Sequence, residues 1–141
     1  MNARLAPAVQ QRAMTVGDID AVVLVEAGAY SFPWTRGNFI DSLAAGYLAE
    51  LLETDDGQLL GYYVAMTGVD EMHLLNLTVD PHWQGRGLSH VLMDAVEAAK
   101  VRRAAATMAR LREEKDRLLV ADLFSLAMEL TGYDAVLRGR R

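Results

Sequence analysis

The chain has 141 residues, which fits one domain, and 52% of them are apolar and 23% charged, as in ordinary globular proteins. It contains no cysteine, which excludes disulfides, thiolate nucleophiles and cysteine-ligated zinc and is compatible with the cytoplasm. No segment approaches the ~20 apolar residues that span a membrane, and the N-terminus lacks a signal-peptide pattern. We therefore expect one cytoplasmic domain over residues 1–141, with no membrane partner.

The charge is unevenly distributed along the chain. Residues 1–99 carry four arginines against thirteen carboxylates, whereas residues 100–141 carry ten basic and six acidic side chains. An acidic front part attracts a basic partner and repels nucleic acid, although an ordinary solvated surface explains the same pattern. The basic tail lacks interleaved aromatic residues and any binding motif, so we expect no nucleic-acid partner.

Two helices are predicted near the N-terminus. Thr15 is expected to cap the first, with Asp18 in the capping-box position. The proline within residues 31–35 ends this helix, because proline has no N–H donor and disfavours helix at the residue before it. Thr35 is expected to cap a second, short helix that ends near Gly46.

Three strands are predicted next. Residues 47–53 and 58–66 are expected to form a hairpin around the turn at residues 55–57. Residues 72–79 form the third strand, which is apolar almost throughout. Such a composition is typical of a central strand that is covered on both faces.

The rest of the chain is predicted to be mainly helical. A helix begins near Leu88 with one apolar face, and residues 101–117 continue or renew it. Residues 118–130 form another apolar helix, which Gly132 is expected to cap. Residues 133–137 are compatible with one short strand. The order of elements predicts an α/β fold with an atypical, helical C-terminal third.

Residues 76–89 indicate an anion-binding site. Here an apolar strand enters a loop with two glycines, and a helix begins at the end of the loop. The first N–H groups of a helix lack internal partners, and its dipole favours negative charge there. Glycines let the backbone approach a phosphate closely. The expected phosphate donors are the backbone N–H groups of Gly85, Arg86, Gly87, Leu88 and Ser89. The Arg86 side chain can add positive charge.

Other readings of this loop remain open. A tight strand-to-helix turn also explains the Gly-x-Gly pattern. The segment is not a P-loop, because no Gly-Lys-Ser/Thr follows it, and it lacks the third glycine of a dinucleotide-binding fingerprint.

The pattern Gln84-x-x-Gly87-x-Ser89 resembles the Gln/Arg-x-x-Gly-x-Gly/Ala signature of the GNAT acetyltransferase superfamily, with a small departure at Ser89. The resemblance implies a loop that holds the pyrophosphate of acetyl-coenzyme A. It also implies that residues 75–81 bind the pantetheine arm through their backbone. The implied cofactor-binding residues are Leu77, Thr78, Val79, Gln84, Gly85, Arg86, Gly87, Leu88, Ser89 and His90.

Further segments within residues 10–100 resemble one GNAT family, the ribosomal-protein-alanine N-acetyltransferases. They are Met14 to Glu26, Ala29-Tyr30, Phe32-Pro33-Trp34, Asn38-Phe39 and the strand Leu-Leu-Asn-Leu-Thr-Val. The resemblance implies a mixed α/β sheet with an N-terminal helix pair, a cofactor strand and a phosphate-binding loop and helix. It implies transfer of acetyl to the α-amino group of an N-terminal alanine of a ribosomal protein. We expect a monomer and no metal.

The substrate site is implied at Phe32, Pro33 and Trp34, whose loop walls the peptide site in that family. A hydrophobic staple between the two helices explains the same residues. Asp70 and Glu71 either attract the substrate amine or form a solvated loop. Three histidines are read as strand or surface residues, although two of them flank the phosphate loop: His73, His82 and His90.

The resemblance ends in the last third, over residues 101–141. Leu111 stands where the family has its general base, and the Leu-Tyr pair with the general acid is missing. No catalytic residue is therefore assigned, although Glu113 or Tyr133 could substitute. Divergence, a shifted reading frame and a different C-terminal architecture all explain the tail. A catalytically impaired module that binds acetyl-coenzyme A, and a GNAT enzyme acting on another amine, remain alternative functions.

Overall fold

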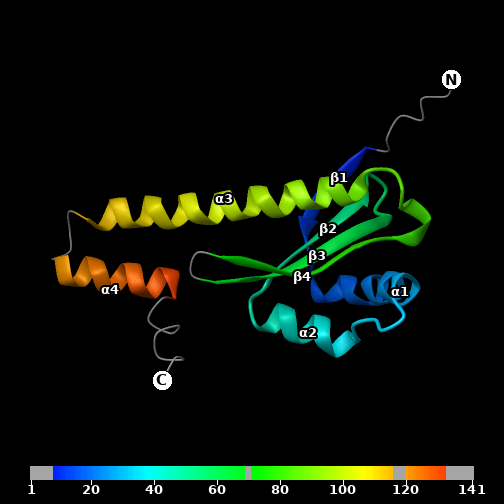
Figure 1. Ribbon diagram of the computed structural model, residues 1–141, viewed down its shortest axis with the longest axis horizontal. Coiled ribbons are helices and arrows are strands. Elements are labelled where there is room, and N and C mark those ends of the chain that lie inside the picture. The colour runs from blue at the N-terminus through cyan, green and yellow to red at the C-terminus, as the bar shows by residue number, and fades with distance from the viewer. Residues whose placement is uncertain (1–7, 69–70, 116–119, 133–141) are drawn as a thin grey trace. The chain divides into compact units, whose positions relative to one another are not determined.

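The computed structural model describes residues 8–68, 71–115 and 120–132 (Figure 1). The chain divides into two compact units. The first comprises Met1–Met66 and Leu74–Asp94, and the second Thr67–His73 and Ala95–Arg141. The predicted strand at residues 133–137 lies outside the described residues.

The predicted N-terminal helix pair is confirmed. A 3₁₀ turn, η1 (Val16–Asp18), leads into α1 (Ile19–Ala29), and α2 (Arg36–Ala44) follows. At the first start, the Thr15 N–H donates to Asp18 Oδ2 at 2.8 Å, as the capping box requires.

The second helix start has the same construction. The Thr35 N–H donates to Asn38 Oδ1 at 2.8 Å, and the Asn38 N–H donates back to Thr35 Oγ1 at 3.2 Å. The segment after α2 reverses direction at Gly46, whose φ of 78° favours glycine. Local sequence therefore fixes both ends of the helix pair.

Asp18 also carries an ion pair whose removal we expect to lower stability. Its carboxylate accepts from the Arg12 guanidinium at 2.7 and 2.8 Å, and this contact holds the pKa of Asp18 well below its usual range. Asp18→Asn is expected to lower the free energy of unfolding at pH 7 by about 1 kcal/mol. Urea titration measures the difference.

The effect should depend on pH. A carboxyl group whose pKa is depressed by folding stabilises the native state above the unfolded pKa of about 4, and loses that contribution as the pH falls toward the folded pKa. The difference between Asp18→Asn and the unmodified chain should therefore shrink below pH ~4. Asp20→Asn, at an exposed pair with Arg36, is the control and should change stability by under about 0.5 kcal/mol. Equal losses for both variants would contradict the assignment.

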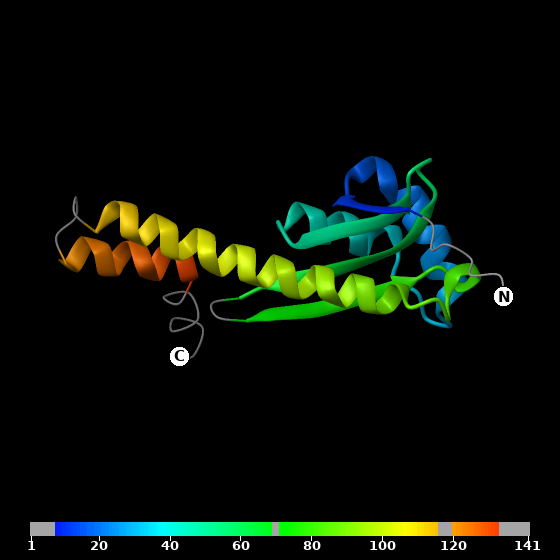
Figure 2. The ribbon, with the colours of Figure 1, turned by 90° about the horizontal axis from the view of Figure 1, so that it is seen from above.

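The sheet contains β1 (Val9–Ala13), β2 (Leu48–Thr54), β3 (Leu59–Thr67) and β4 (Met72–Val79), in that order (Figures 1 and 2). β1 pairs with β2 and β2 with β3, both antiparallel. The predicted hairpin over β2 and β3 is thus confirmed.

One strand was not predicted from the sequence, and another was misplaced. The sequence did not predict β1, whose residues are all exposed and which β2 and ion pairs hold in place. The prediction that residues 72–79 form a central, doubly covered strand is wrong, because β4 is the last strand in the order of the described sheet. Leu74 and Leu75 are each 39% exposed, so apolar composition here does not mean full burial.

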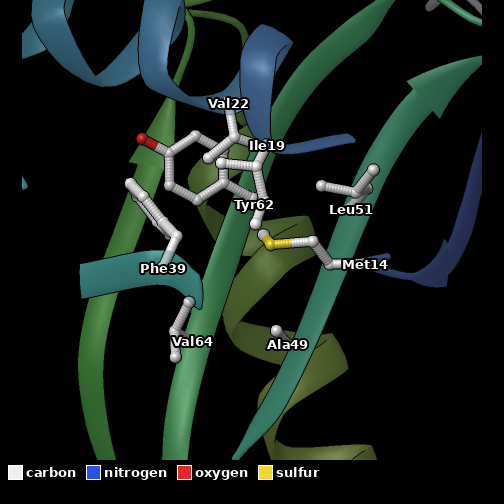
Figure 3. Packing of buried hydrophobic residues seen from close by; sticks show 8 residues of the cluster. All are labelled: Met14, Ile19, Val22, Phe39, Ala49, Leu51, Tyr62 and Val64. Carbon is white, nitrogen blue, oxygen red and sulfur yellow. The ribbon is translucent and has the colours of Figure 1, made fainter. Parts of the chain in front are cut away.

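The core of the first unit lies between the helix pair and the sheet (Figure 3). Phe39 of α2 meets Tyr62 of β3 edge to face, with ring centroids 5.7 Å apart. Ile19 and Val22 of α1 are fully buried beside them. The cluster consists of Met14, Ile19, Val22, Phe39, Ala49, Leu51, Tyr62 and Val64. These apolar residues anchor α1 and α2 on β2 and β3.

The predicted helical C-terminal third is confirmed in the described residues. Residues 101–114 continue α3 (Leu88–Glu114), and α4 (Val120–Thr131) follows. The buried positions of α3 repeat at helical spacing: Leu88, Leu92, Ala95, Val96 and Ala99. Gly132 has a φ of 68°, as expected for a residue that ends a helix. Among the helices of the described residues, none combines the length and the apolar composition of a membrane-spanning segment.

Candidate functional site

A cavity of about 460 Å³ opens in the first unit where β4 ends and α3 begins. Between them lie the 3₁₀ turn η2 (Pro81–Trp83) and the glycine loop. The lining includes nine of the ten residues that the sequence assigns to cofactor binding: Leu77, Thr78, Val79, Gln84, Gly85, Gly87, Leu88, Ser89 and His90. This volume lies within the ~300–1,000 Å³ that is usual for small-molecule sites.

The loop conformation depends on its two glycines. Gly85 and Gly87 have φ values of 77° and 79°, a region that other residues rarely adopt. A Cβ atom at either position would meet no atom within 4 Å, so there is open space beside the loop. The Gln84 side chain fixes the loop to the strand end, because its Nε2 donates to the Val79 carbonyl at 3.1 Å.

The start of α3 supplies the electrostatics of the cavity. The Val91 N–H is directed at the Gly87 carbonyl at 3.4 Å, and the amides before it belong to the first turn, where helix N–H groups have no carbonyl of their own helix to bind. Leu88, Ser89 and His90 of this turn line the cavity. The helix dipole adds positive potential at the same place, so the site suits a phosphate or another anion.

Arg86 is the predicted cofactor residue that does not line the cavity. Its guanidinium carbon lies 4.7 Å from the centroid of the Trp83 ring. This cation–π contact keeps the charge beside the loop. Trp83 itself lines the cavity.

Another part of the lining comes from the end of α1. Ala29 and Tyr30 line the cavity there. The Tyr30 hydroxyl donates to the Leu77 carbonyl at 3.0 Å and lies 3.2 Å from Thr78 Oγ1. The sequence did not assign Ala29, Tyr30 or Trp83 to the site. Ala29-Tyr30 appeared there only as part of the family resemblance.

In the predicted substrate loop, one of the three assigned residues packs on the core and the other two are exposed to solvent. Trp34 packs on the core of the first unit, with its ring centroid 5.3 Å from that of Phe39. Phe32 is 96% exposed, and Pro33 is exposed as well. None of the three lines the cavity.

The remaining polar candidates lie on the surface. His73 pairs with Glu71 at 2.9 Å, and His82 pairs with Asp80 at 2.8 Å. His90 is exposed but contributes to the cavity lining. Asp70 lies outside the described residues. Within the described ranges, no group of three or more His, Asp or Glu side chains is arranged to hold a metal ion.

The residues considered for catalysis all belong to the range Ala95–Arg141 of the second unit. Leu111 is in α3, where it lines a smaller cavity of about 280 Å³ with Met108 and Thr107. Glu113 is an exposed residue of the same helix. Tyr133 lies outside the described residues. No carboxylate is among the described residues that line the larger cavity.

Residues 41–116 match the family model described as "Acetyltransferase (GNAT) domain", which is more than half of the chain. This chain belongs to the GNAT acetyltransferase family. The ribosomal protein bS18-alanine N-acetyltransferase of Escherichia coli K12 is 30% identical to it over 91 residues, which cover 64% of this chain and 61% of the relative. The relative from Salmonella typhimurium is 31% identical over 81 residues, 57% of this chain and 54% of its own.

Solved structures agree on the GNAT fold. The crystal structure of the E. coli ribosomal-protein-S18-alanine N-acetyltransferase matches with a TM-score of 0.62 and 26% identity, over 67% of this chain and 61% of that chain. A Thermoplasma acidophilum N-acetyltransferase in complex with coenzyme A matches with a TM-score of 0.61 at 11% identity, over 69% and 74%. This GNAT chain spans about three fifths of the length of the curated relatives that it matches.

Proposed function

We propose that this GNAT protein transfers the acetyl group of acetyl-coenzyme A to the α-amino group of an N-terminal alanine of a ribosomal protein, in the cytoplasm. The observation that carries the proposal is the cavity at the end of β4, which the predicted cofactor residues line. The names of the relatives at about 30% identity support the acceptor. We propose residues 1–141 as one acetyltransferase domain whose residues 101–141 depart from the family pattern.

The cofactor would be held by backbone groups. The N–H groups of the loop and of the first turn of α3, from Gly85 to Ser89, would bind the pyrophosphate. Leu77, Thr78 and Val79 of β4 would face the pantetheine arm. Arg86 would add charge beside the loop while it stays on Trp83. Acetyl-coenzyme A, when bound, supplies a thioester carbonyl that an amine can attack.

The amine must be neutral to attack. An α-amino group has a pKa of about 8, so a modest fraction is neutral at pH 7 without a general base. A positioned base typically contributes about 10²–10⁴-fold more. Because the described cavity lining holds no carboxylate, we leave the general base unassigned, and turnover should be slow at neutral pH and increase toward pH 8.

A second candidate function is a module that binds acetyl-coenzyme A with little or no turnover. The position of Leu111 favours it, because this residue lies in a helix where the family resemblance implies a strand with the base. An enzyme that acetylates a different amine is the third candidate. The three differ in turnover and in acceptor preference.

The test is acetyl-coenzyme A consumption by the purified protein with a short peptide that begins with alanine, while calorimetry measures coenzyme A affinity. The same peptide with a blocked N-terminus is the matched control, and a free polyamine is the competing acceptor. Turnover with the free α-amino peptide alone supports the proposal. Coenzyme A binding without turnover supports the second candidate, and preference for the polyamine supports the third.

A further inference from the structure

A buried carboxylate lies between the proposed substrate loop and the cofactor strand. Glu26 of α1 is 1% exposed. Its Oε1 accepts from the Trp34 backbone N–H at 3.0 Å, and its Oε2 accepts from the Tyr62 hydroxyl. Asn76 Nδ2 is within 3.2 and 3.1 Å of the two oxygens. Three separate segments therefore donate to one carboxylate.

Burying the Glu26 carboxylate costs free energy unless all three donors are in place. A buried charge without hydrogen bonds is strongly unfavourable, and an apolar side chain in its place would leave the buried donors without an acceptor. The Tyr62 partner stays protonated, because burial raises its pKa and the bond to Glu26 raises it further. The three donors therefore need an acceptor at this point, and the next question is which segments they connect.

The donors connect the substrate loop with the cavity wall. The Trp34 amide belongs to residues 31–35, and Asn76 lies on β4. Thr78 Oγ1 donates to Asn76 Oδ1 at 2.7 Å and lies 3.2 Å from the Tyr30 hydroxyl. Thr78 and Tyr30 both line the cavity. Hydrogen bonds thus run from the loop through Glu26 to the cavity wall.

We propose that Glu26 is a positioning residue that fixes the 31–35 loop against β4 and thereby sets where the acceptor amine meets the cofactor cavity. The link to the acceptor rests on the proposed function. The tie between loop and strand does not depend on it. Glu26 touches neither acceptor nor cofactor in this assignment, and it acts through Trp34, Asn76 and Thr78.

The chemistry of the donors explains why a carboxylate is needed. Trp34 and Asn76 present only N–H groups to it, and a carboxylate offers two acceptor oxygens. Glutamine has the same shape but only one acceptor oxygen. Its NH₂ group would oppose at least one N–H donor, so Glu26→Gln loosens the tie of the loop to β4 without leaving a cavity.

The matched control is Tyr62→Phe. It removes a donor from the same carboxylate on the β3 side, and Tyr62 neither belongs to the loop nor lines the cavity. Both variants should lose stability, because each leaves a buried polar group with fewer partners. Only Glu26→Gln should loosen residues 31–35.

The experiment has one readout that does not need activity. The chain has two tryptophans, so a Trp83→Phe background leaves Trp34 as the only tryptophan, and excitation at its long-wavelength edge avoids the tyrosines. In that background, Glu26→Gln should increase acrylamide quenching of Trp34 in the folded protein, while Tyr62→Phe leaves it unchanged. Unchanged quenching in Glu26→Gln, or an equal increase in both, would overturn the positioning role.

The second readout is the KM for the alanine-starting peptide, measured in variants that retain Trp83. Glu26→Gln should raise the KM for the alanine-starting peptide about fivefold, the effect of one lost hydrogen bond, and leave coenzyme A affinity unchanged. Equal KM changes in Tyr62→Phe would overturn the role. If the unmodified chain shows no turnover, the proposed function fails and the quenching result alone decides whether Glu26 fixes the loop.

Discussion

Gly87→Asp is expected to weaken coenzyme A binding by more than about tenfold, the largest effect of any variant considered. The substitution introduces a carboxylate beside the first amides of α3, where the site is proposed to bind a pyrophosphate. Two negative groups within a few ångströms repel each other strongly where solvent is partly excluded. Calorimetric titration with coenzyme A measures the change.

The effects of backbone conformation and of charge on coenzyme A affinity can be separated at position 87. Gly87 has a φ of 79°, which aspartate and asparagine tolerate better than most residues, and a Cβ atom there meets nothing within 4 Å. Gly87→Asn has nearly the same shape as Gly87→Asp without the charge, so it serves as the matched control. We expect Gly87→Asn to retain most of the affinity. Similar losses for both variants would assign the effect to backbone strain, and unchanged affinity in Gly87→Asp would remove the phosphate-cradle assignment.

Gly61→Ala is expected to lower the free energy of unfolding by about 2–3 kcal/mol, as in overpacked cores. A Cβ atom at Gly61 of β3 would lie 2.6 Å from the Thr78 carbonyl oxygen and 3.0 Å from Leu92 Cδ1. The first obstacle is backbone and cannot rotate away, so β4 must shift. Because Thr78 lines the cavity, coenzyme A affinity should fall together with stability.

Gly37→Ala is the control for Gly61→Ala. Its Cβ would meet only Thr35 Oγ1, at 3.6 Å, and the residue lies in α2, where alanine is favoured over glycine by up to about 1 kcal/mol. Urea titration should therefore show equal or higher stability for Gly37→Ala. A Gly61→Ala variant within about 0.5 kcal/mol of the unmodified chain would mean that β3 and β4 are less closely packed than described.

Elements with local signals could be predicted from the sequence, and elements that depend on distant partners could not. Thr15, Thr35 and Gly46 specify turns and caps within a few residues, so the helix pair was predicted correctly. β1 is polar and exposed, and Val9 pairs with Thr54 far along the chain. No local pattern indicates such a strand. The close approach at Gly61 was likewise invisible, since a glycine within a strand does not say what lies above it.

The site residues also divide into those with local sequence signals and those that depend on distant partners. The loop and strand residues near Gly85 and Gly87 form one continuous motif, and the structure brings them to a single cavity. Tyr30 reaches that cavity from the end of α1, and the sequence distance between Tyr30 and Leu77 conceals their hydrogen bond. Glu26 also passed unnoticed as a polar centre, because its partners Trp34, Tyr62 and Asn76 come from three different segments.

The two capping boxes have a consequence for how the chain folds. Each one specifies a helix start within four residues, at Thr15 and at Thr35, without help from the sheet. Such local interactions persist as fluctuating structure in a denatured chain. The helix pair should therefore supply the early contacts of folding, while the long-range closure of β1 on β2 limits the rate.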